Sequence, residues 1–146
     1  MPNHADAEVA SIPKDFEDLF EARSLGHLAT VMPDGSPQVT PVWIDYDGTH
    51  LIVNSAKGRV KSDNMLERPE VAIEVMDGTE PYRYLAVRGD VVEIIDGDEA
   101  EAHIDKLAHK YLGVAKYPSA NRAPGEERVM FKIAPRSVHG FASRRR

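Results

Sequence analysis

Hydrophobic and polar residues alternate in several short runs of this chain, a two-residue period typical of β-strands with one buried face. Turn sequences such as Asp34-Gly35 and Asp47-Gly48 separate consecutive runs. The pattern predicts strands over residues 28–32, 38–46, 51–54, 71–76, 84–95 and 129–133, and a last short strand around 138–139. Helical spacing instead marks residues 13–24, a short segment between Asn54 and Arg68-Pro69, and residues 98–112.

Two residues inside the predicted strands indicate irregular backbone. Pro41 interrupts one strand, which suggests an edge position, a bulge or backbone left open for a ligand. Gly89 falls in the longest strand and predicts a kink there.

Tight turns between consecutive strands require antiparallel pairing. Six or seven such strands with about three helices favour a mainly β (α+β) domain, in which a small antiparallel barrel carries helices at its sides and ends. We expect one domain over residues 13–140, a loose N-terminal segment over 1–12 and a basic C-terminal tail over 141–146 that ends in Arg144-Arg145-Arg146.

Composition narrows the function. The chain has 146 residues, enough for one buried core, and a net charge of −6, which argues against general nucleic-acid binding. It has no cysteine, which removes disulfides, thiolate catalysis and zinc–thiolate sites. No apolar run approaches membrane-spanning length. We therefore expect a cytoplasmic protein with no nucleic-acid or membrane partner.

The most informative stretch joins the third predicted strand to the second helix. It places Lys57, Arg59 and Lys61 at alternate positions around the start of that helix. Backbone N–H groups at a helix start already favour an anion, and lysine and arginine add full charge. In an acidic chain this local cluster predicts a phosphate site, although the same residues could also form a solvated helix face.

The histidines do not predict a metal site. His103 and His109 lie six residues apart on the third helix, so they do not share a face, and we expect both at the surface. Carboxylate pairs such as Asp96 and Asp98 resemble charges at a helix start rather than acid–base machinery.

Four segments together resemble the flavin/deazaflavin split-barrel superfamily, also called pyridoxamine 5'-phosphate oxidase-like, and most closely its reductases that use the deazaflavin coenzyme F420. The segments are Gly26–Val31 with the Pro33-Asp34-Gly35 turn, Pro37–Trp43, Gly58–Asn64 followed by Pro69, and Pro81–Gly89. The resemblance covers roughly residues 14–140. It implies an antiparallel split β-barrel and a homodimer with cofactor sites at the interface.

Carried over position by position, the resemblance also implies roles for single residues. Arg59 and Lys61 would hold the cofactor phosphate, and Asn64 would support that region. Lys57 departs from the pattern and either adds charge at the phosphate or points to solvent. The phosphate and ribityl chain would be lined by Asn54, Ser55 and Ala56, the ring by Thr40, Pro41, Val42 and Trp43, and the partner subunit would contribute Tyr82 and Arg83.

The function implied is an oxidoreductase in which reduced F420 transfers hydride to an activated double bond or quinone-like acceptor. No catalytic side chain is assigned, because the cofactor carries the chemistry; Tyr82 is only a candidate proton donor. Two alternatives share the fold: an enzyme that uses flavin mononucleotide (FMN), and a non-enzymatic protein that binds a cofactor or a haem-related ligand. A barrel that binds no nucleotide, with dimerisation as its role, is a third.

Overall fold

The computed structural model describes residues 9–142 and contains one seven-stranded antiparallel sheet in the order β2-β1-β5-β6-β7-β4-β3. Its strands are β1 (Gly26–Val31), β2 (Pro37–Val42), β3 (Asp45–Tyr46), β4 (Leu51–Ala56), β5 (Glu70–Met76), β6 (Arg83–Asp96) and β7 (Arg128–Ala142). The α-helices are α1 (Asp18–Glu21), α2 (Val60–Glu67) and α3 (Asp98–Leu112), with short 3₁₀ turns at Lys14–Phe16 and Ser119–Asn121. The antiparallel split-barrel prediction with about three helices is confirmed.

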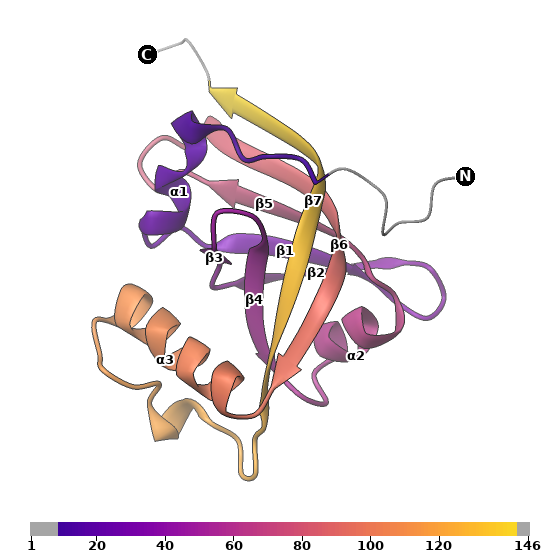
Figure 1. Ribbon diagram of the computed structural model, residues 1–146, viewed down its shortest axis with the longest axis vertical. Helices are drawn as coiled ribbons and strands as arrows, with labels where there is room; N and C mark the ends of the chain where they lie inside the picture. The colour runs from indigo at the N-terminus through magenta and orange to yellow at the C-terminus, as the bar shows by residue number, and fades with distance from the viewer. Residues whose placement is uncertain (1–8, 143–146) are drawn as a thin grey trace.

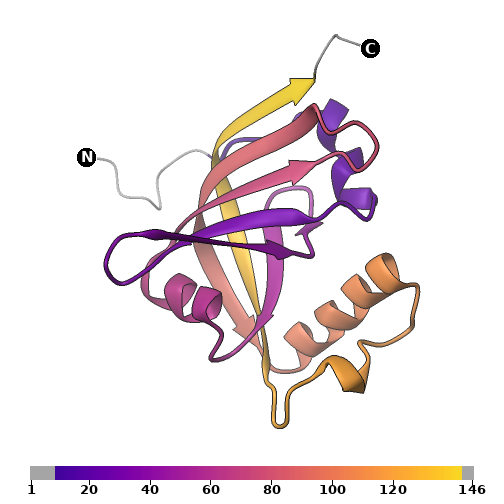
Figure 2. The ribbon, with the colours of Figure 1, turned by 180° about the vertical axis from the view of Figure 1, so that it is seen from behind.

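The long strands β6 and β7 run the length of the molecule and join its two halves (Figure 1). Helix α3 and the segment after it lie at one end, and α1 lies near the other end (Figures 1 and 2). Within residues 9–142, no helix is both long and apolar enough to cross a membrane.

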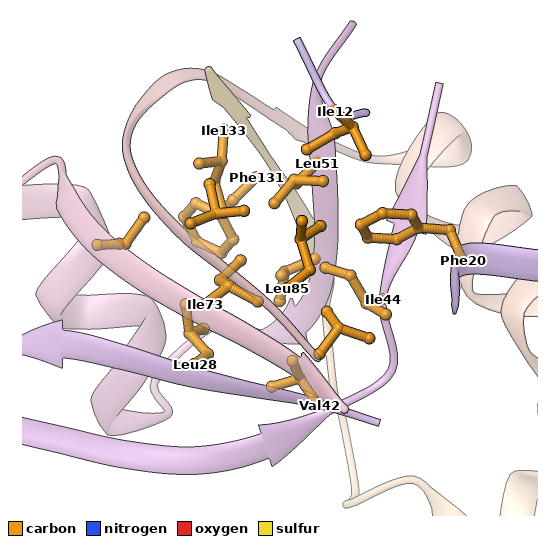
Figure 3. Close-up of a cluster of buried hydrophobic side chains, with 14 of the residues drawn as sticks. Ile12, Phe20, Leu28, Val42, Ile44, Leu51, Ile73, Leu85, Phe131 and Ile133 are labelled. Atoms are coloured by element: carbon orange, nitrogen blue, oxygen red, sulfur yellow. The ribbon is translucent and has the colours of Figure 1, made fainter. Parts of the chain in front are cut away.

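The core fills the interior of the curved sheet. Side chains from nearly every strand and from the N-terminal segment converge there, as Figure 3 shows for Ile12, Phe20, Leu28, Val42, Ile44, Leu51, Ile73, Leu85, Phe131 and Ile133. The hydrophobic residues that alternate with polar ones along the strands thus point to one inner face of the sheet. Ile12 is buried and the Ala10 N–H donates to Pro135 O, so residues 10–12 pack against the barrel. Residues 1–8 and the arginines at 144–146 lie outside the described part.

Three predictions of secondary structure were wrong, two of them in the N-terminal half of the chain. The helix predicted over 13–24 is only a 3₁₀ turn and the four residues of α1, because Ala22 is extended as the chain turns toward β1. The strand predicted over 38–46 is two strands: β2 pairs with β1, and β3 pairs with β4 at the opposite edge of the sheet. The break at Trp43-Ile44 is where the chain crosses between these edges.

The two short C-terminal strands predicted around Pro135 are one strand, β7. Pro135 lies opposite Gly89, where the β6–β7 register shifts, so the bulge accommodates the missing N–H of the proline. A Cβ at Gly89 would lie 2.4 Å from Ala134 O, so only glycine fits there. The predicted kink at Gly89 is confirmed. Of the three possibilities for Pro41, the structure shows the edge position, on β2.

Candidate functional site

A cleft of about 320 Å³ opens between the end of β2, the start of α2 and helix α3. We call it the cation cleft. Its lining residues are Leu25, Pro41, Val42, Trp43, Asn54, Arg59, Lys61, Ile104, Tyr117 and Arg128. The fold brings together six residues singled out from the sequence, namely Pro41, Val42, Trp43, Asn54, Arg59 and Lys61.

The start of α2 presents two cations to the cation cleft. Arg59 directly precedes the helix, and its Nη2 donates to Glu126 Oε1 at 3.1 Å. Lys61, in the first turn, forms no hydrogen bond or ion pair with any described residue. Burial lowers the pKa of Lys61, and the charges of Arg59 and Arg128 lower it further. Lys61 is thus a half-buried cation without a counter-ion.

Arg128 is a third cation in the cation cleft and was missed by sequence analysis. It begins β7 directly opposite Ala56, two residues along β4 from Asn54. Its Nε donates to Asn54 Oδ1 at 2.9 Å and its Nη1 to Glu126 Oε2 at 3.2 Å. Its side chain is only 3% exposed. The only available signal was an arginine between two glutamates and the apolar run Val129–Phe131, which does not reveal which cavity the side chain faces.

Among the described residues, the three cations have only one carboxylate beside them. Glu126 accepts from both Arg59 and Arg128, while Lys61 remains unpaired. Burial would raise the pKa of Glu126, but the hydrogen bond from Arg128 and the charges of both arginines outweigh it and lower the pKa, so Glu126 stays ionised. Two positive charges are therefore unbalanced, which suits an anionic group such as a phosphate.

Aromatic side chains form one wall of the cation cleft. The Trp43 ring stacks on Tyr111 with centroids 5.1 Å apart and meets the Tyr117 ring edge-on at 5.9 Å. The Arg128 guanidinium lies 5.2 Å from the centre of the Tyr117 ring. The Tyr111 hydroxyl donates to Ser24 O and accepts from Ile44 N, which fixes the wall to the crossing between β2 and β3. Next to the cations there is thus a rigid aromatic surface.

His103 was predicted at the surface, and this was wrong: it is buried beneath the cation cleft. Its Nε2 lies 3.0 Å from Asp45 Oδ2, and its Nδ1 lies 3.1 Å from Asn54 Nδ2. The periodicity of α3 placed His103 beside the buried Ile104 and Leu107, but two polar partners on distant strands could not be anticipated. His109 is exposed as expected.

Five other predicted site residues lie outside the lining of the cation cleft: Thr40, Ser55, Ala56, Lys57 and Asn64. Ser55 and Ala56 are buried under α2, where the Ser62 hydroxyl donates to Ala56 O and accepts from the Ser55 hydroxyl. Asn64 donates to Thr30 Oγ1 and accepts from Arg68, so it ties α2 to β1. Lys57 pairs with Asp96 and Glu127 at 2.8 and 3.0 Å, so its charge is already balanced.

Tyr82 and Arg83 lie at the opposite end of β6 from the cation cleft. Tyr82 is exposed in a turn. The Arg83 guanidinium pairs with Asp18 at 2.6 Å and Asp77 at 2.8 Å and lies over the Phe16 ring. Within one subunit neither residue reaches the cleft, and their role across a dimer stays a prediction.

A second hollow, of about 510 Å³, lies on the outer face of the sheet. It is larger but mostly apolar, with His27, Glu74, Arg88 and His139 spaced among alanines. In the described part of the chain, no three side chains are grouped so as to hold a metal ion. The smaller cleft is the better candidate, because several cations of residues 9–142 converge there with unbalanced charge.

Comparison with known proteins places the chain in a family. The family model described as pyridoxamine 5'-phosphate oxidase matches residues 12–142. A solved structure described as an F420 reductase shares 39% identity, with a TM-score of 0.76, over 88% of this chain and 98% of that one. No curated protein matches.

Two more distant structures share the fold. A conserved hypothetical protein of Mycobacterium tuberculosis is 23% identical, with a TM-score of 0.68, over 94% of this chain and 89% of its own. HupZ of Group A Streptococcus is 16% identical, with a TM-score of 0.62, over 90% and 99%. Together, the matched family model and the 39% identical structure show that this chain belongs to the pyridoxamine 5'-phosphate oxidase family.

Proposed function

We propose that this protein is an oxidoreductase that binds coenzyme F420 in the cation cleft and uses it to reduce an activated C=C bond or a quinone-like acceptor. The observation that carries the proposal is the pair of unbalanced positive charges beside an aromatic wall. Reduced F420 supplies a hydride when bound, so the chain needs only to bind, orient and exclude water.

The cations suit the phosphate end of such a cofactor. Arg59 offers a planar fork that can bind phosphate through two hydrogen bonds, and Lys61 offers a compact charge with three donors. Among the described residues, Arg128 Nη2 has no acceptor, so this edge of the guanidinium is available to a ligand. An anion there would also lower the free energy of the mutually repelling Arg59, Lys61 and Arg128.

The remaining lining suits a ring. Trp43 supplies a flat aromatic surface, and apolar side chains of Leu25, Val42 and Ile104 keep water from its neighbourhood. Pro41 has no N–H and lies on the edge strand β2, which leaves the adjoining backbone open toward the cleft.

A second copy of the chain would complete this site in the proposal. The cleft of one chain lies near the lower end of the size range for small-molecule sites, while the cofactor is elongated. The family resemblance, with its interfacial sites, supports the same arrangement, in which the exposed Tyr82 would come from the partner, while Arg83 stays paired with Asp18 and Asp77 of its own chain. Sedimentation equilibrium of the purified protein measures this: we expect a dimer, and a monomer at cofactor-saturating concentration would contradict it.

The relatives support F420 over other cofactors. The 39% identical structure is described as an F420 reductase, and the alignment covers nearly all of that chain. FMN also has a ring, a ribityl chain and a phosphate, so the donors in the cation cleft suit both molecules.

The test mixes purified protein with reduced F420 and a panel of quinones and activated alkenes and follows oxidation of the cofactor. We expect turnover with at least one acceptor and tighter binding of F420 than of FMN. Preferential binding of FMN would make the protein a flavin enzyme, and binding of F420 without turnover would make it a cofactor-binding protein. Either result would contradict the proposal.

A further inference from the structure

A continuous line of hydrogen bonds runs from β3 to the cation cleft. Asp45 on β3 bonds to His103 on α3, and His103 bonds to Asn54 on β4. Asn54 bonds to Arg128 on β7. Glu126 then joins Arg128 to Arg59, at the start of α2. One cation of the cleft, Arg128, is therefore tied through Asn54 and His103 to the carboxylate of Asp45.

The partners fix the direction of these bonds. Arg128 Nε can only donate, so the Asn54 atom facing it must be the amide oxygen. The Asn54 amide nitrogen then faces Ala100 O at 2.9 Å and His103 Nδ1 at 3.1 Å and donates to both. His103 Nδ1 must accept, so the imidazole proton is on Nε2 and is donated to Asp45.

Because these side chains are buried, the directions of their hydrogen bonds cannot easily change. The side chains of His103 and Arg128 are 7% and 3% exposed, so water cannot readily replace a lost partner. If the Asn54 amide turned over, its nitrogen would face the Nε–H of Arg128, and two donors would meet in a buried space. His103 and Ala100 O both oppose that rotation.

We infer that His103 is a positioning residue for the anion site: by accepting from Asn54, it holds the guanidinium of Arg128 with its Nη2 edge toward the cation cleft. This inference rests on the proposed function only for its effect on affinity. The arrangement itself can be measured in the ligand-free protein.

Two variants of similar size separate the two bonds of His103. His103→Asn places a carbonyl oxygen at the position of Nδ1, so it keeps an acceptor for Asn54 but cannot reach Asp45. His103→Gln places its amide at the position of Nε2, so it can reach Asp45 but removes the acceptor at Nδ1 and leaves Asn54 with Ala100 O alone. A general loss of stability would affect both variants alike.

The first readout is the Arg128 Nε–H resonance in nitrogen-15 NMR spectra of the ligand-free proteins. We expect slow exchange of this proton with water in the wild type and in His103→Asn, and at least tenfold faster exchange in His103→Gln. The second readout is the dissociation constant of inorganic phosphate, followed by Trp43 fluorescence. We expect it to rise about tenfold in His103→Gln and less than threefold in His103→Asn.

Equal exchange and equal phosphate affinity in the two variants would overturn the positioning role and leave the proposed function standing. Failure of the wild type to bind phosphate, with the NMR difference intact, would instead overturn the proposed phosphate site and the affinity effect. The wild type gives a check that needs no variant: long-range nitrogen-15 couplings must show the His103 proton on Nε2, and the other tautomer would contradict the inference.

Discussion

The two ends of β6 and β7 hold two arginine clusters of opposite character. At one end, the single cation Arg83 faces the carboxylates of Asp18 and Asp77. At the other end, Arg59 and Arg128 share the carboxylate of Glu126, and Lys61 has no ion pair with a described residue. In the first cluster every positive charge is paired, and the ion pairs hold α1 and the β5–β6 turn against the barrel. The second cluster has more positive than negative charges; we call the first the saturated cluster. Counting partners thus separates a structural arginine from cations available to a ligand.

The largest effect is expected from a variant that removes two cations of the cation cleft. In the double variant Arg59→Ala and Lys61→Ala, affinity for F420 should fall at least about 100-fold, because charge-assisted hydrogen bonds contribute about 1.5–3 kcal/mol each. Isothermal titration calorimetry measures this. Lys57→Ala is the matched control, since Lys57 is paired with Asp96 and Glu127 and should leave the affinity within twofold. Equal losses in the two proteins would remove the distinction between paired and unpaired cations.

A smaller effect is expected from a variant that removes Arg83, the cation of the saturated cluster. Arg83→Met should lower the free energy of unfolding by about 1–2 kcal/mol, because Asp18 and Asp77 lose their shared partner and repel each other. Urea unfolding at neutral pH measures this loss. Affinity for F420 should stay within threefold, because Asp18 and Asp77 already occupy the guanidinium of Arg83. A tenfold weaker affinity at unchanged stability would instead support a contact from the partner subunit.

The smallest effect is expected from Lys110. Unlike the arginines of the two clusters, Lys110 is bonded to carbonyls and not to carboxylates, so no negative charge of residues 9–142 balances it directly. Its Nζ donates to Phe20 O and Ile44 O, and burial lowers its pKa to about 8. Between pH 8 and about pH 10 the unfolded chain binds more protons than the folded one, so the free energy of unfolding should rise with pH. We expect a gain of the order of 1 kcal/mol relative to Lys110→Met. Parallel pH profiles of the two proteins would contradict this.

Much of the fold was predictable because strand alternation and turn residues are local signals. The errors came where tertiary pairing decided the outcome. The strand through Pro41 and Trp43 divides because its halves pair at opposite edges of the sheet, and β7 continues past Pro135 because Gly89 bulges opposite it. Neither partner is visible from the segment itself.

The site residues also fall into those that local sequence reveals and those that it does not. Arg59 and Lys61 could be found because a helix start and clustered charge are encoded within a few residues. Arg128 and His103 could not, since their partners come from elsewhere: Asn54 lies 74 positions from Arg128, and Asp45 lies 58 positions from His103. Lys57 matched the local pattern equally well, yet Asp96, 39 positions away, balances its charge.

The most direct test of the central claim compares each cofactor with its phosphate-free counterpart. Dissociation constants of the wild-type protein would be measured for F420, for FMN and for the corresponding molecules that end at the ribityl hydroxyl. If the cation cleft holds the phosphate, removing that group should weaken the preferred cofactor at least about 100-fold, and added salt should narrow the difference. Equal affinity with and without the phosphate would contradict the account.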